Sequence, residues 1–117
     1  MAARKARPSA EAQAALLRTR PLIAEFGPGL VDDLAADLAL ARDTGHALNP
    51  GRIVAGSWGL GVAILWPDGR PAGALSIAAI ENRMGFLRQA ELVAALNREC
   101  HLIGRSLAAL EPQRRSA

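Results

Sequence analysis

Two alternating segments joined by a turn constrain the fold of this chain more than any other feature. Residues 59–66 alternate bulky and small side chains, the bulky ones being Leu60, Val62, Ile64 and Trp66. This period of two predicts a β-strand. Pro67-Asp68-Gly69 predicts a turn, because Pro fixes φ, Asp hydrogen-bonds nearby backbone and Gly accepts a positive φ. Residues 74–79 alternate in the same way, so the sequence predicts a β-hairpin.

The two faces of this hairpin are expected to differ in side-chain size. One face carries the bulky residues and is the predicted core. The other face carries only very small residues: Gly59, Gly61, Ala63, Ala74, Ser76 and Ala78. Small side chains in a strand allow another group to approach the backbone closely. The hollow that they leave is open to two interpretations, a closely packed protein element or a bound ligand.

Three helices are predicted around the hairpin. The first covers residues 10–19, after Ser9 as N-cap, and the second covers 30–44, with Gly45 as its C-terminal residue. The third covers 87–110, and Pro112 is expected to mark its end. Residues 22–29 and 81–85 are expected to form loops. This order predicts an α+β domain with an antiparallel hairpin, and residues 52–55 (RIVA) are a candidate third strand.

Length and composition fit one small domain. The chain has 117 residues, half of them hydrophobic but only 3% aromatic, so oligomerisation would help to stabilise a core of this size. The domain is expected to span residues 9–111. Residues 1–8 are predicted to be a disordered basic lead-in, and residues 112–117 a disordered tail.

Several functional classes are not expected. The net charge is +3, but no aromatic residues are interleaved with the terminal cations, so direct DNA binding by this chain is not predicted. The single cysteine, Cys100, and the absence of zinc-type spacing predict neither a disulfide nor a metal or other cofactor. No signal peptide or membrane span is visible, which favours a cytoplasmic protein. No nucleophile–base motif is present, so an enzyme is not expected.

Beyond these patterns, three stretches in order resemble a known family. They are "LALARDTGHALNPG", "GSWGLGVAILWPDGRPAGALSIAAIENRM" and the long amphipathic C-terminal helix. Together they resemble the effector-binding domain of IclR-type transcription regulators, over nearly the whole chain. The resemblance implies a GAF-like domain, of which this chain matches only the C-terminal half. The winged helix-turn-helix and the first strands of the sheet have no counterpart here, as in a truncated, split or degenerate regulator.

The resemblance also implies a ligand site. In the family, a small effector, often a carboxylate, binds between the sheet and the loops. The corresponding positions here are Asn49, Gly59, Ser76 and Ala78, where Ala78 replaces a serine, and Trp58 is expected to close the site. From the residues alone, Asn49 is equally a turn former, and Ser76 is equally a buried hydroxyl bonded to a neighbouring carbonyl.

Two functions follow from this resemblance. The leading prediction is a truncated or degenerate domain that binds a small-molecule effector. The alternative is an interaction module whose exposed sheet edges pair with a second copy or with a full-length regulator. A small-molecule effector is the expected ligand if the leading prediction holds. The expected protein partner is a second copy of the chain or a regulator chain.

Overall fold

The computed structural model describes residues 10–18, 21, 25 and 27–115. The chain divides into two compact units, residues 1–48 and 49–117, which are considered separately. Several predicted segments lie outside the described residues: the lead-in at 1–8, the Ser9 cap, residue 19 of the first helix, residues 22–24 and 26 of the loop predicted over 22–29, and residues 116–117 of the tail.

Among the described residues of the first unit, the helices α1 (Ala10–Arg18) and α3 (Leu30–Thr44) pack against each other. The bounds of α3 confirm the predicted helix. Its end forms as expected, because Gly45 has a φ of 84° and donates its backbone N–H to the Ala41 carbonyl at 2.8 Å. Glycine adopts this left-handed conformation without steric cost, which explains why the helix ends there.

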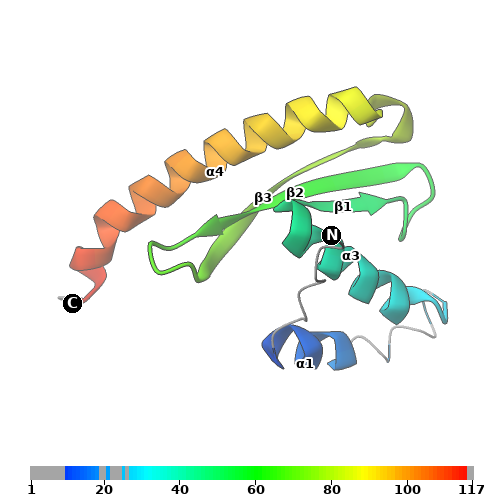
Figure 1. Cartoon of the computed structure of the whole chain (residues 1–117), viewed down its shortest axis with the longest axis horizontal. Helices are drawn as coiled ribbons and strands as arrows, with labels where there is room; N and C mark the ends of the chain where they lie inside the picture. The colour runs from blue at the N-terminus through cyan, green and yellow to red at the C-terminus, as the bar shows by residue number, and fades with distance from the viewer. Residues whose placement is uncertain (1–9, 19–20, 22–24, 26, 116–117) are drawn as a thin grey trace, which may run out of the picture. The chain divides into compact units, whose positions relative to one another are not determined.

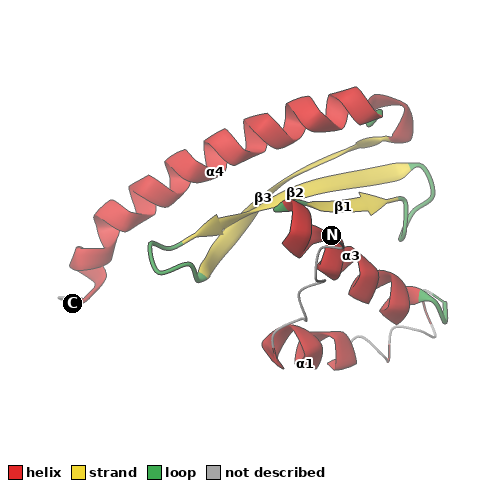
Figure 2. Cartoon of the chain, viewed as in Figure 1, coloured by secondary structure: helices red, strands yellow, loops and turns green. Residues whose placement is uncertain are grey.

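The second unit is built on a three-stranded sheet in the order β1-β2-β3 (Figure 2). Its strands are β1 (Ala47–Pro50), β2 (Ser57–Leu65) and β3 (Pro71–Ile80). β2 and β3 are antiparallel, which confirms the predicted hairpin. Its turn also forms as predicted: Gly69 has a φ of 88°, and the Asp68 carboxylate accepts a hydrogen bond from the Arg70 backbone N–H at 3.0 Å.

The position of the third strand differs from the prediction. Residues 52–55 form a bend and turn, and the third strand is β1, which precedes them. Two glycines with positive φ, Gly51 at 72° and Gly56 at 81°, enclose this segment and reverse the chain. The Asn49 side chain fixes the start of the reversal by accepting a hydrogen bond from the Arg52 N–H at 2.8 Å. These turn interactions override the strand propensity of Ile and Val.

The last helix, α4 (Phe86–Arg115), also differs from the prediction at both of its ends. The segment before it, expected as a polar loop, forms a 3-10 helix η2 (Glu81–Arg83) followed by a fully buried methionine, Met84. At the other side, Pro112 does not end the helix. Its fixed φ lies in the helical range, so the backbone continues although Pro112 cannot donate a hydrogen bond to the preceding turn.

The core of the second unit lies between α4 and the bulky face of the hairpin (Figure 1). Among the described residues, the buried apolar side chains are Leu60, Val62, Ile64, Met84, Leu96 and Cys100. The Cys100 thiol, which is buried, donates a weak hydrogen bond to the Val62 carbonyl at 3.6 Å. α4 covers only this face, so the small-residue face lies on the opposite side of the sheet.

We predict that Gly104→Val destabilises the second unit. A Cβ at Gly104 would lie 3.2 Å from the Leu65 carbonyl oxygen, so α4 would have to move away from β2. Valine has a better helix propensity than glycine, so any loss must come from this steric contact. The expected cost is about 1–3 kcal/mol of unfolding free energy, measured by urea denaturation.

The matched control is Ser106→Val, on the same helix at an exposed position. It introduces the same β-branched side chain without a neighbouring strand, and should change stability by no more than about 0.5 kcal/mol. A Gly104→Val variant as stable as the control would contradict the close packing of α4 on β2.

A second prediction concerns Met84, which only the structure identifies as core. Met84→Ala should cost about 2–5 kcal/mol, because its side chain is 1% exposed and its removal leaves a cavity. Leu102→Ala, at a position that is 49% exposed, should cost much less. Equal effects of the two substitutions in denaturation curves would show that Met84 is not part of the core.

Candidate functional site

The strand register assembles the small residues into one continuous face. Gly59 lies opposite Ala78, Gly61 opposite Ser76, and Ala63 opposite Ala74. Directly opposite residues of an antiparallel pair point to the same side of a sheet. The two columns therefore form a single surface, which we call the small-residue face.

Asn49 borders this face from the neighbouring strand β1. Its Cβ lies 3.8 Å from the position that a Cβ on Gly59 would occupy. Its Oδ1 atom is held by the Arg52 N–H, so the turn-forming role considered for Asn49 is confirmed. Within the described residues, no hydrogen bond involves its Nδ2 group, which leaves an amide donor beside Gly59.

Ser76 is the only hydroxyl-bearing residue of the small-residue face. The interpretation of Ser76 as a buried hydroxyl is wrong, because the residue is exposed. Its hydroxyl makes no hydrogen bond to any residue that the structure describes. Ala78, two positions along β3, is also exposed and offers no polar group. The face thus presents one free hydroxyl, above backbone that glycine and alanine leave accessible.

Trp58 does not share this face. It lies opposite Ala79 and alternates with Gly59, which places its side chain on the same side of the sheet as Leu60 and α4. Its indole Nε1 is 3.6 Å from where a Cβ on Gly51 would stand. The structure therefore brings together Asn49, Gly59, Ser76 and Ala78, but not the tryptophan that was expected to close the site.

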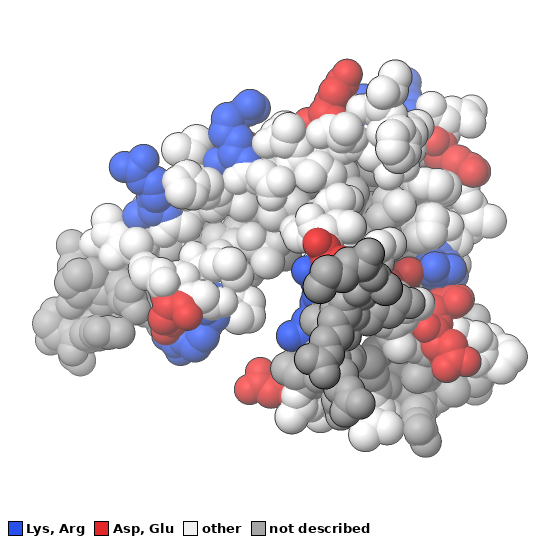
Figure 3. Space-filling model, viewed as in Figure 1, with Lys and Arg blue, Asp and Glu red and all other residues white. Residues whose placement is uncertain are grey.

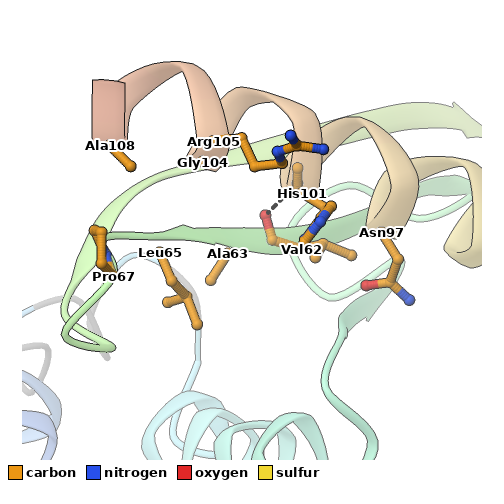
Figure 4. A pocket seen from close by; sticks show the side chains of 10 residues that line it. Val62, Ala63, Leu65, Pro67, Asn97, His101, Gly104, Arg105 and Ala108 are labelled. Atoms are coloured by element: carbon orange, nitrogen blue, oxygen red, sulfur yellow. Dashed lines mark hydrogen bonds between the residues drawn. The ribbon is translucent and has the colours of Figure 1, made fainter. Parts of the chain in front are cut away.

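A cavity of about 320 Å³ lies beside α4 at the end of β2, and its lining reaches Ala63 at the margin of the small-residue face (Figure 4). Its apolar wall includes Val62, Leu65 and Cys100. Its polar residues come from α4: Asn97, His101 and Arg105. These three are spaced four apart and so share one helix face. This cavity was not predicted, although the i, i+4, i+8 row of polar residues is visible in the sequence.

The charges of the described surface are mixed in sign. Red and blue side chains are interspersed on the visible face (Figure 3). Several are paired, as in Arg70–Asp68 at 2.7 Å, Arg88–Glu91 at 2.8 Å and Arg98–Glu99 at 3.7 Å. Exposed pairs of this kind contribute little to stability. Interspersed charges do not form the broad basic surface that binds nucleic-acid phosphates.

The described part of the chain has neither a metal-binding cluster nor a membrane-spanning helix. No three His, Cys, Asp or Glu side chains are grouped so that they could hold a metal ion. Across the same residues, no helix is both long enough and apolar enough to cross a lipid bilayer.

Comparison with solved structures relates this fold to transcription regulators. The repressor BlcR of Agobacterium tumefaciens matches 66% of this chain at 25% identity, with a TM-score of 0.60. The IclR protein of Thermotoga maritima matches 66% at 23% identity, with a TM-score of 0.60. An IclR-family regulator from Brucella abortus matches 86% at 16% identity, with a TM-score of 0.62.

These matches cover only part of each regulator. The chain spans 32% of BlcR, 31% of the Thermotoga protein and 38% of the Brucella protein. No protein-family model matches the sequence, and no curated protein matches it. The likeness therefore lies in the fold: this chain has the α+β, partial GAF-like fold of one part of an IclR-type transcription regulator.

Proposed function

We propose that this chain is a small-molecule effector-binding domain of an IclR-type regulator, with a regulatory role in the cytoplasm and no catalytic one. The observation that carries the proposal is the small-residue face. The four residues that the family resemblance singles out, Asn49, Gly59, Ser76 and Ala78, lie together there. The similarity of fold to IclR-type regulators supports the same role.

The chemistry of this face favours a small carboxylate. The Ser76 hydroxyl and the Asn49 Nδ2 group are both hydrogen-bond donors, and hydrogen bonds to an ionised acceptor are stronger than those between neutral groups. Gly59 and Gly61 allow a ligand to approach the backbone. Ala78 supplies no second hydroxyl, so the ligand would depend on Ser76 more than in relatives that carry serine at both positions.

The cavity beside α4 is the competing location for an anion. Arg105 and His101 line it and come from adjacent turns of the same helix. All three polar residues of that cavity are exposed, and their side chains are free to stay in water. The small-residue face is favoured because the family resemblance places its ligand-binding positions there, and because Gly59 and Gly61 leave the backbone of that face accessible to a ligand.

The first test is a panel of aliphatic and aromatic carboxylates, each paired with its uncharged amide. A ligand that binds only the folded state adds about 2.7 kcal/mol to the free energy of unfolding at a hundredfold excess over Kd. This stabilisation raises the melting temperature. We expect at least one acid, but not its amide, to raise the melting temperature. A panel in which no acid acts would contradict the proposal.

The second test locates the site. Ser76→Ala should weaken binding of the active acid by about tenfold or more, the loss expected for a hydrogen bond to a charged group. Ser106→Ala, which removes an exposed hydroxyl on α4, is the matched control and should leave affinity unchanged. Binding that Arg105→Gln abolishes and Ser76→Ala preserves would assign the ligand to the cavity beside α4 instead.

A further inference from the structure

The cavity beside α4 holds a cation but no acidic side chain. Its lining includes the Arg105 guanidinium, the His101 imidazole and the Asn97 amide, and it contains no Asp or Glu. Among the described residues, Arg105 has no ion-pair partner, whereas Arg88 and Arg98 on the same helix are each paired with a carboxylate. The described part of the chain therefore leaves the charge of Arg105 available to an anion from solution.

The polar groups of the cavity follow one side of α4 over consecutive turns. Asn97, His101 and Arg105 are spaced four residues apart, which is about 6 Å along the helix axis for each step. Figure 4 shows the Arg105 side chain extending back toward His101. The guanidinium and the imidazole can therefore contact the same group of a ligand, whereas the Asn97 amide can reach only a different part of that ligand.

The wall that faces these groups is apolar and belongs to the second half of β2. β1 has only four residues, and Asn49 lies beside Gly59, so β1 borders the first half of β2. Beyond it, Val62, Leu65 and then Pro67 line the cavity. Apolar surface beside a cation strengthens the attraction of that cation for an anion. The volume of about 320 Å³ suits a small organic molecule.

We propose that this cavity binds a small phosphate monoester, with the phosphate group between Arg105 and His101 and the apolar body against Leu65. A carboxylate has two oxygens, and one guanidinium fork engages both of them. A phosphate group has three terminal oxygens, so it can bind the fork and still accept a hydrogen bond from the imidazole N–H, which is present in either protonation state. The proposal does not depend on carboxylate binding at the small-residue face.

The surroundings of the cavity favour a free small molecule over the phosphates of a nucleic acid. A nucleic-acid backbone requires several cations along one surface. The lining of the cavity contains a single arginine, Arg105, and the neighbouring Arg98 is paired with Glu99. One cation beside an apolar wall matches a ligand with one phosphate group and an apolar body.

The test is titration of the full chain with phenyl phosphate in a phosphate-free buffer, followed through backbone amide NMR shifts. We expect saturable shifts at His101, Gly104 and Arg105. Benzoate, which has the same ring but a carboxylate, should bind more weakly, and so should inorganic phosphate, which has no ring. Phenol, which has neither anionic group, should cause no saturable shift.

Three variants locate the site. Arg105→Gln should raise the dissociation constant of phenyl phosphate about tenfold or more, the loss expected for hydrogen bonds to a charged group. Arg98→Gln removes the same charge from an exposed position of α4 outside the cavity. It is the matched control and should leave the dissociation constant nearly unchanged. Ser76→Ala should also leave it unchanged, which separates this site from the proposed effector site.

Several results would overturn the proposal. The absence of saturable shifts at millimolar phenyl phosphate would show that the cavity is not a phosphate site. Equal effects of Arg105→Gln and Arg98→Gln would reduce the binding to general charge attraction, and a loss of binding in Ser76→Ala would move it to the small-residue face. Equal affinity for benzoate or inorganic phosphate would contradict the ligand class. Tighter binding of a short DNA duplex, at the same concentration of phosphate groups, would assign Arg105 to a nucleic acid.

Discussion

The second unit depends on the packing of α4 against one face of the hairpin. From Trp58 to Ile64, β2 presents bulky side chains at alternate positions, so one face can hold a helix and the other has mostly small side chains. Gly104 lets α4 come within van der Waals contact of the Leu65 carbonyl, and Cys100 packs onto Val62. Because α4 packs on this face, it does not cover the small-residue face, where the effector site is proposed.

The hairpin and its turn were predictable because the alternation of side chains and the turn residues are local features of the sequence. α3 was predictable for the same reason, because an apolar stripe and a terminal glycine define its extent. The third strand was not. Ile53 and Val54 have strand propensity, but the turn fixed by Asn49, Gly51 and Gly56 determines the backbone there. Met84 was not predicted as a core residue because its burial depends on the position that η2 gives it, and the local sequence pattern does not show that position.

The candidate site was predictable in part. The alternation of side chains along the two strands is enough to group Gly59, Ser76 and Ala78 on one face. The same alternation places Trp58 on the other face, so the expectation that Trp58 closes the site did not take its position in the strand into account. Whether Ser76 would be buried depended on which elements cover the face, and sequence does not determine that. The cavity lined by Asn97, His101 and Arg105 was missed because it exists only where α4 crosses the end of β2.

The proposed function depends on the binding of a small carboxylate to the small-residue face. The most direct measurement is titration of the full chain with the active acid, followed residue by residue through backbone amide NMR shifts. We expect the largest amide shifts at Gly59, Gly61 and Ser76, and we expect them to saturate as the concentration of the acid rises. Shifts confined to residues 97–105 of α4, or no saturable shifts at all, would contradict it.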